Sequence, residues 1–164
     1  MHIHKFPFFI YSLLIFSISF SAQSWAGEDL IKGAKWSVVG DIEIPPGKAG
    51  IFYQNGKPVA AISGDQYSPW CQLVFKDAGQ EPRKIVKGHY VITKITYDDD
   101  AINPTQISYK TMMQLKPADS SDIASLAQII CGHWDDNTGS YLTVKEIRQA
   151  LDGVMRLELS SAKG

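Results

Sequence analysis

Most of the chain consists of short segments in which apolar and polar residues alternate, separated by turn residues. Alternation with a period of two places every second side chain on one face, which predicts half-buried β-strands. No repeated helical segments link these strands, so we expect an all-β, mainly antiparallel sandwich or barrel of about eight strands with one short C-terminal helix. Alternation is clearest in residues 36–44, 71–76, 89–97, 106–116 and 154–159.

A β-hairpin is the strongest local prediction. Asn55-Gly56 lies between the segments 49–54 and 57–63 and fits a type I′ turn, in which both central residues need positive φ. Pro58 has no backbone donor, which places the second strand of this hairpin at a sheet edge or at a strand start.

Two other segments are interpreted from the turn residues that they contain or that follow them. Residues 36–44 are expected to form one half-buried strand that ends at Pro45-Pro46-Gly47. Asp98-Asp99-Asp100 and Asn103-Pro104 are expected to form the connection that follows the strand 89–97. The apolar residues on one side of the first strand are Trp36, Val38, Ile42 and Ile44.

The C-terminal third contains one ambiguous segment and one clear helix. Residues 123–134 fit helical spacing, with a cap among residues 120–122, and also fit strand alternation; the preceding strand and short turn favour an antiparallel strand. Thr143 and Glu146 have the spacing of a capping box, which predicts a helix start, and Gly153 suits the left-handed end of that helix.

Residues 1–26 have the pattern of a secretory signal. A short polar start is followed by an uncharged apolar run over residues 6–20, and Ser24-Trp25-Ala26 provides small residues around a cleavage point. The alternative is an uncleaved membrane anchor, although the apolar run is shorter than the ~20 residues that span a bilayer. We expect a single exported domain, residues 27–164, that is periplasmic or secreted and has no membrane span after cleavage.

The two cysteines, Cys71 and Cys131, follow this segment, and in an oxidising compartment an even number predicts a disulfide. Closing a loop of about 60 residues contributes ~4 kcal/mol on the chain-entropy model. A redox pair is the alternative, but the chain has no Cys-x-x-Cys motif. We therefore predict a structural disulfide.

Charge and motifs exclude several function classes. The 16 basic and 17 acidic residues give a net charge of −1, whereas nucleic-acid binding needs a strongly basic surface. No Gly-x-Ser-x-Gly, His-Glu-x-x-His, P-loop or dinucleotide-binding motif is present. After residue 26 the histidines are His89 and His133, interpreted as surface groups at strand ends. We assign no catalytic residue, and an undetected hydrolase remains an alternative.

One segment, residues 135–146, has the spacing of a degenerate EF-hand calcium loop. Gly139 and Ser140 depart from the pattern, and the capping box and a turn explain the matching residues equally well. Calcium binding is thus an alternative hypothesis, and no other cofactor is expected. The candidate ligands are Asp135, Asn137, Tyr141 and Glu146.

Tyr67 and Trp70 lie in a Ser/Pro/Asp loop directly before Cys71. A loop anchored by a disulfide and carrying two aromatic residues is a candidate contact site. The alternative is that Trp70 packs over the disulfide and shields it.

Several segments resemble a group of small exported bacterial proteins of unknown function. They are Ile44-Pro45-Pro46-Gly47-Lys48-Ala49, Gln54-Asn55-Gly56, Tyr67, Cys71-Gln72-Leu73, Cys131 and residues 142–151. The resemblance favours a strand at residues 125–131, and it implies no activity and no functional residue. Together these observations predict a non-enzymatic exported envelope protein that acts by binding a protein or ligand, with no nucleic-acid partner.

Overall fold

The computed structural model describes residues 34–60, 65–85, 87–119 and 126–159, so the predicted signal segment lies outside the described residues. No helix in these ranges is long and apolar enough to cross a membrane. The elements are β1 (Lys35–Val38), β2 (Ile42–Ile44), β3 (Gly50–Gln54), β4 (Lys57–Val59), β5 (Trp70–Phe75), β6 (Arg83–Ile85), β7 (His89–Asn103), β8 (Gln106–Pro117), β9 (Leu126–Asp136), α2 (Val144–Ala150) and β10 (Met155–Glu158).

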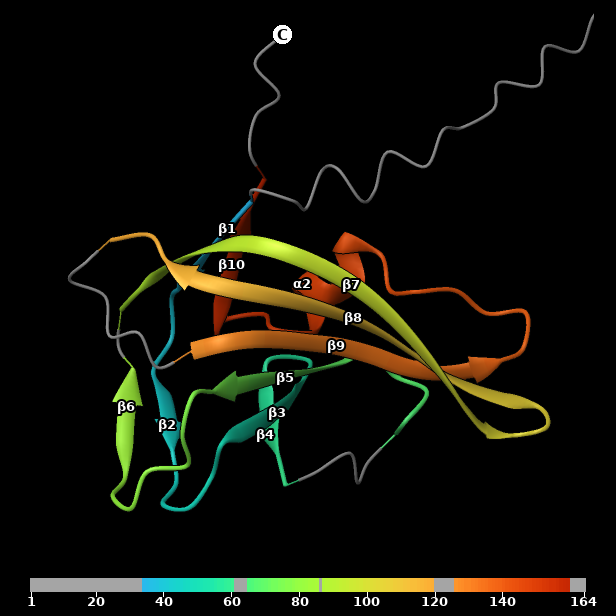
Figure 1. Ribbon diagram of the computed structural model, residues 1–164, viewed down its shortest axis with the longest axis horizontal. Helices are drawn as coiled ribbons and strands as arrows, with labels where there is room; N and C mark the ends of the chain where they lie inside the picture. Colours follow the sequence, from blue (N-terminus) through green and yellow to red (C-terminus); the bar gives the residue numbers. More distant parts are fainter. Residues whose placement is uncertain (1–33, 61–64, 86, 120–125, 160–164) are drawn as a thin grey trace, which may run out of the picture.

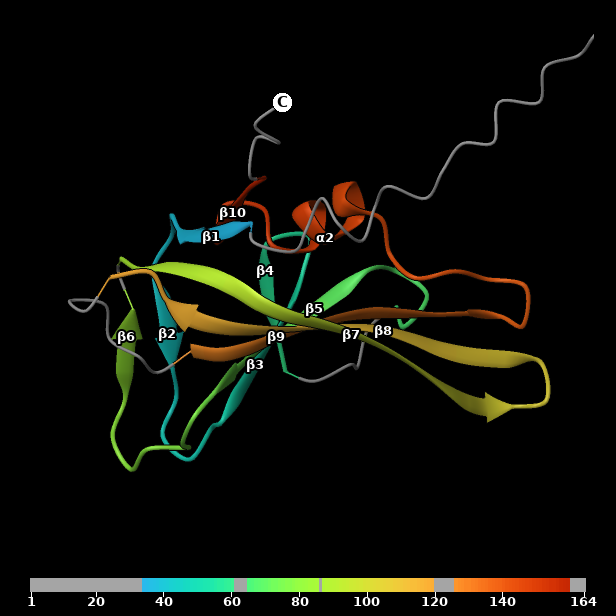
Figure 2. The ribbon, with the colours of Figure 1, turned by 45° about the horizontal axis from the view of Figure 1, so that its top comes forward.

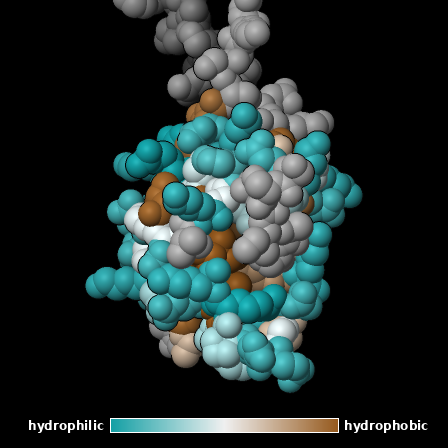
Figure 3. Space-filling model, turned by 90° about the vertical axis from the view of Figure 1, so that its left-hand side faces the viewer, coloured by the Kyte–Doolittle hydropathy of each residue, from teal (hydrophilic) through white to brown (hydrophobic). Residues whose placement is uncertain are grey.

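Eight of these strands form one antiparallel sheet in the order β10-β1-β7-β8-β9-β5-β3-β4. The sheet curls into a half-barrel, and β2 and β6 form a small second sheet beside one end of it (Figures 1 and 2). Viewed from that end, the surface is mostly hydrophilic around a small apolar area (Figure 3). The predicted fold class, all-β and mainly antiparallel with one short helix near the C-terminus, is confirmed.

The hydrophobic core lies between the curled sheet and α2. Ile147, Ala150 and Leu151 at the helix are buried in the same cluster as alternate residues of the sheet strands, such as Leu73 and Ile129. Because burying a large aliphatic side chain stabilises a protein by about 1.5–3 kcal/mol, this cluster dominates the favourable side of folding. The helix thus fills the open side of the half-barrel.

The capping box predicted at the helix start is confirmed. The Thr143 hydroxyl accepts a hydrogen bond from the Glu146 N–H at 3.3 Å, and Glu146 Oε2 accepts one from the Thr143 N–H at 2.8 Å. Gly153 has a φ of 69°, the left-handed conformation expected after the helix. The chain then enters β10, the predicted last strand.

The hairpin prediction is also confirmed. Asn55 and Gly56 have φ of 49° and 72°, and Gln54 pairs with Lys57 across the turn. Pro58 lies in β4, which is an edge strand of the large sheet, as expected for a residue without a backbone donor. The part of the predicted strand that covers residues 61–63 is outside the described residues.

The interpretation of residues 36–44 as one strand is wrong. The segment forms β1 in the large sheet and β2 in the small one, with a break around Gly40. At Gly40 the backbone passes so close to the Gly153 carbonyl that a Cβ would overlap it. The chain leaves the sheet at this contact, although all four predicted apolar residues, Trp36, Val38, Ile42 and Ile44, are buried.

The prediction that residues 98–100 form a connection is wrong as well. They lie inside β7, where Asp98 pairs with Lys110 and Asp100 with Ser108 of β8. Lys110 Nζ is 3.6 Å from Asp98 Oδ2 and also contacts the Asp100 carboxylate, so a cross-strand cation offsets charges that suggested a loop. The turn is at residues 103–106, so the Asn103-Pro104 part of the predicted connection is confirmed.

The ambiguous segment is a strand. β9 covers residues 126–136 and pairs with both β8 and β5, which confirms the favoured interpretation over residues 126–134. Residues 120–125, including the start of that segment and its alternative cap, are outside the described residues.

Candidate binding site

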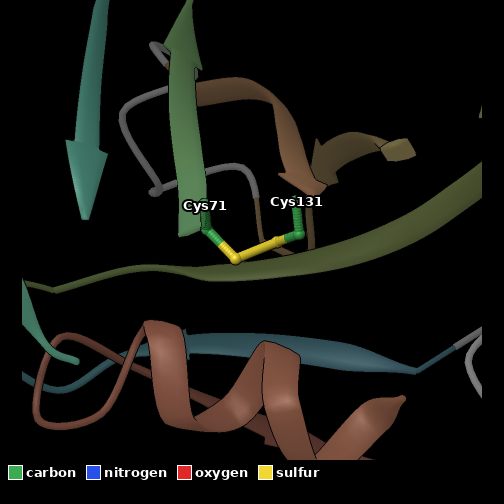
Figure 4. The surroundings of a disulfide bond; sticks show 2 residues. All are labelled: Cys71 and Cys131. Carbon is green, nitrogen blue, oxygen red and sulfur yellow. A yellow bond between two sulfur atoms is a disulfide. The ribbon is translucent and has the colours of Figure 1, made fainter. Parts of the chain in front are cut away.

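The predicted disulfide joins two neighbouring strands. Cys71 of β5 lies directly across from Cys131 of β9, and both side chains are fully buried (Figure 4). Cys71 is the second residue of β5, so the bridge ties β9 to the point where the loop of residues 65–69 enters the sheet. The backbone around this loop is therefore held at its C-terminal end by a covalent bond.

Trp70 occupies the other face of the same two strands. Adjacent residues in a strand point to opposite faces, so the Trp70 side chain is on the other side of the sheet from Cys71. Trp70 pairs with Gly132, and its ring lies so close to Gly132 that a side chain at that position would contact it. Its ring meets Phe52 edge-on at 5.8 Å, and only 3% of the residue is exposed. Trp70 therefore neither covers the disulfide nor offers a free contact surface, which differs from both alternatives for this residue.

Tyr67, in contrast, is 56% exposed and lies at a hollow of about 220 Å³. We call this the distal hollow. It combines the loop before β5 with the end of β9 and the start of α2, so the two candidate segments from the sequence meet here. Its lining residues are Tyr67, Pro69, His133, Trp134, Asp135, Leu142 and Glu146.

Local hydrogen bonds position the Tyr67 loop. Asp65 accepts bonds from the Tyr67 N–H at 3.1 Å and from the Ser68 hydroxyl at 2.6 Å, an arrangement that fixes a tight turn. The Gln66 carbonyl accepts a 2.8 Å bond from the Trp134 N–H of β9. Tyr67 Oη also accepts a bond from Gln106 of β8. The loop is thus attached to two strands of the sheet.

Two carboxylates and one imidazole lie in the hollow. Asp135 Oδ2 is 3.6 Å from His133 Nε2, and the Asp135 side chain packs against Gly139. Glu146 Oε2 accepts a 2.6 Å bond from the Thr143 hydroxyl in addition to the capping bond. Hydrogen bonding by Thr143, with smaller contributions from nearby His133 and Lys145, lowers the pKa of Glu146. Glu146 is therefore ionised at neutral pH.

A tyrosine cluster, Tyr97, Tyr109 and Tyr141, adjoins the hollow. Tyr141 packs against Tyr97 at 4.8 Å and against Tyr109 at 5.5 Å between ring centroids, and the Tyr109 ring is 6.1 Å from that of His133. Tyr141 Oη donates to Asp99 Oδ1 at 3.3 Å, and burial followed by the charge of Asp99 raises the pKa of Tyr141. The cluster therefore connects β7 and β8 to one lining residue of the hollow, His133.

The four predicted calcium ligands are only partly brought together. Asp135 and Glu146 line the distal hollow, whereas Asn137 lies in an exposed turn and Tyr141 packs in the tyrosine cluster. The element before the loop is strand β9, not the helix of an EF-hand. In the described ranges no group of three or more His, Cys, Asp or Glu side chains is arranged to hold a metal ion.

The second histidine lies in a different hydrogen-bonded set. Ser37 Oγ is 3.0 Å from His89 Nδ1 and donates to Glu158 Oε1 at 3.1 Å. The serine has one proton, so when it donates to Glu158 the imidazole must donate to the serine. A catalytic triad needs the histidine in the middle, accepting from the serine. This set has the opposite order and does not activate Ser37 as a nucleophile.

Sequence reasoning identified Tyr67, Asp135 and Glu146 but not the tyrosine cluster of which Tyr97 and Tyr109 are part. Their spacing gives one usable signal, because Tyr97 and Asp99 are two residues apart and so share a face. Comparisons of the chain with protein-family models, curated proteins and solved structures find no match.

Proposed function

We propose that this protein is a non-enzymatic exported protein of a bacterial envelope, periplasmic or secreted, that acts by binding a protein or ligand. The apolar segment of residues 6–20, followed by Ser24-Trp25-Ala26, supports export. The buried Cys71–Cys131 disulfide is consistent with an oxidising compartment.

One observation carries the binding proposal: the distal hollow joins an exposed aromatic side chain, Tyr67, to the carboxylates of Asp135 and Glu146. These groups come from three segments: the loop before β5, the end of β9 and the start of α2. A disulfide, a capping box and a turn hold those segments in place, so little conformational entropy is lost when a ligand binds. Rigid placement of convergent aromatic and polar groups is typical of binding sites.

Binding is tested by amide chemical-shift mapping on uniformly labelled protein recovered after export in a bacterial host. The probes are the Nα-acetyl methylamides of lysine, arginine, norleucine and glutamate, which share one backbone and differ in side-chain charge. We expect at least one probe to shift the resonances of Tyr67, Trp134 and Asp135 in a saturable titration. Absence of saturable shifts at the hollow with all four probes would overturn the proposal.

Calcium binding is the second candidate function, because Asp135 and Glu146 share the hollow and both offer carboxylate oxygens. A ligand that binds only the folded state at ~100 times its dissociation constant adds ~2.7 kcal/mol to stability. We therefore expect thermal unfolding in millimolar calcium to have a higher midpoint than in chelator, and Glu146→Gln to abolish the difference. Superimposable curves would exclude this function.

A further inference from the structure

We infer that the distal hollow binds an organic cation, a primary ammonium or guanidinium group on an apolar stem. This inference rests on the proposed binding function and names its ligand chemistry. Three properties of the hollow carry it: its two carboxylates, its aromatic lining and its size.

The lining of the hollow contains more acidic than basic side chains. Its lining contains Asp135 and Glu146 and, among the described residues, no Lys or Arg. On the face of the sheet opposite to Asp135, which is also the face of Trp134, Lys110 of β8 pairs with Asp98 and Asp100. Asp99, between those two, is on the same face as the tyrosine cluster and accepts from Tyr141. A cation entering the hollow therefore meets two carboxylates whose basic neighbours are His133, 3.6 Å from Asp135, and Lys145, which precedes Glu146 in the chain.

The aromatic lining favours the same ligand. Tyr67 and Trp134 border the hollow, and the face of an aromatic ring carries partial negative charge that attracts ammonium and guanidinium groups. Pro69 and Leu142 supply apolar surface against which an aliphatic stem can pack. Anionic ligands are disfavoured by both carboxylates, and a neutral apolar ligand would gain nothing from their charge.

Size limits the occupant to one group. The hollow encloses about 220 Å³, whereas clefts that bury a whole small-molecule ligand usually measure ~300–1,000 Å³. It suits a single long side chain or one end of a polyamine. Both sources present the same chemistry.

The test compares matched probes by chemical-shift titration. The lysine and norleucine methylamides have similar apolar stems, and only lysine has the ammonium group. We expect the lysine and arginine probes to bind at least about tenfold more tightly than norleucine and glutamate, a difference that corresponds to ~1.4 kcal/mol. We also expect binding to weaken when salt rises from about 10 to about 150 mM, because screening shortens the reach of surface charges.

Variants assign the effect to the hollow. Glu146→Gln removes the charge and keeps a side chain that completes the capping box, and Asp135→Asn is the corresponding change in β9. We expect the double variant to bind the lysine probe about tenfold more weakly, as the loss of ~1.4 kcal/mol requires. The double variant Asp41→Asn, Asp77→Asn removes two exposed carboxylates, which pair with Lys84 and Arg83, and is the charge-matched control that should leave binding unchanged. Tyr67→Leu should weaken binding, and Tyr67→Phe should restore it.

Each outcome separates the two proposals. If norleucine or glutamate saturates the hollow as tightly as lysine, the cation inference is overturned and the binding proposal stands. If no probe binds, both are overturned. Retained amide dispersion in each variant confirms that it is folded. Spermidine and an acetylated Ala-Ala-Lys-Ala-Ala amide then distinguish a free polyamine from a protein side chain, and tighter binding of either supports the shared chemistry.

Discussion

At the scale of single residues, Glu146 combines two roles that substitutions can separate. Its carboxylate completes the helix cap with Thr143 and also lines the distal hollow. The cap was predictable from sequence because both residues lie within one helical turn. The contact between Tyr141 and Asp99 was not, because the two are 42 residues apart and only the pairing of β7, β8 and β9 brings them together.

Removing the cap should destabilise the fold. Glu146→Ala leaves the Thr143 N–H without its 2.8 Å partner, which we expect to cost about 1 kcal/mol and to lower the unfolding midpoint by roughly 3 °C. Glu146→Gln should stay close to the wild-type midpoint because glutamine also completes a capping box. Thermal unfolding by circular dichroism measures both. Equal losses in the two variants would show that charge, rather than capping, stabilises this helix.

The stability contributed by the Glu146 charge should depend on pH. The pKa of Glu146 is lowered from 4.5 in the folded protein, so folding favours its ionised form. That contribution is fully present above pH 4.5 and disappears as pH falls through the lower, folded-state value. We expect the difference in midpoint between wild type and Glu146→Ala to be constant from pH 7 to about pH 5 and to shrink below it. A difference that grows on acidification would contradict the lowered pKa.

At the scale of elements, local patterns predicted individual strands well and their boundaries less well. The hairpin β3–β4 follows from its own turn residues. The break between β1 and β2 depends on a contact of Gly40 with the distant Gly153 carbonyl, which no local pattern contains. β6 was not predicted, because its three residues are too few for alternation and its partner β2 is far away in sequence.

The β3–β4 hairpin contacts the end of α2 through Gly56, and we predict that this contact stabilises the fold. Gly56 has a φ of 72° and donates to the Ala150 carbonyl at 3.0 Å, and a Cβ there would overlap the Asp152 carbonyl oxygen. Gly47 has a similar φ of 70° with open space around it, so it provides the matched control. We expect Gly47→Ala to cost about 1–2 kcal/mol, and Gly56→Ala to cost at least about 1 kcal/mol more.

Guanidinium unfolding at equilibrium measures both glycine variants. Similar losses at the two positions would mean that backbone conformation alone matters and that the hairpin does not depend on its contact with the helix end. A larger loss at Gly56 would show that the hairpin and helix are stabilised together, as their shared hydrogen bond indicates.

At the scale of the whole molecule, the disulfide links the formation of the sheet to the position of the distal hollow. Cys71 and Cys131 are 60 residues apart in sequence. Their strands, β5 and β9, are neighbours in the large sheet, between β8 on one side and β3 on the other. The pairing followed from the count of two cysteines. Their position directly opposite each other in neighbouring strands did not, because it depends on the register of β5 against β9.

Losing this cross-link should remove a large part of the stability of the fold. Cross-linking residues 60 apart lowers the entropy of the unfolded chain by an amount worth about 4 kcal/mol, out of a usual total of ~5–15 kcal/mol. We expect the double variant Cys71→Ala, Cys131→Ala to lose at least that much in guanidinium unfolding, because both side chains are fully buried and alanine also leaves a cavity. Wild-type protein unfolded and refolded in reductant keeps both sulfur atoms and separates the two effects. If reduced wild type is nearly as stable as the oxidised form, strand pairing and the α2-covered core hold β5 against β9 without the bond, and the preorganisation of the distal hollow must come from hydrogen bonds and packing alone.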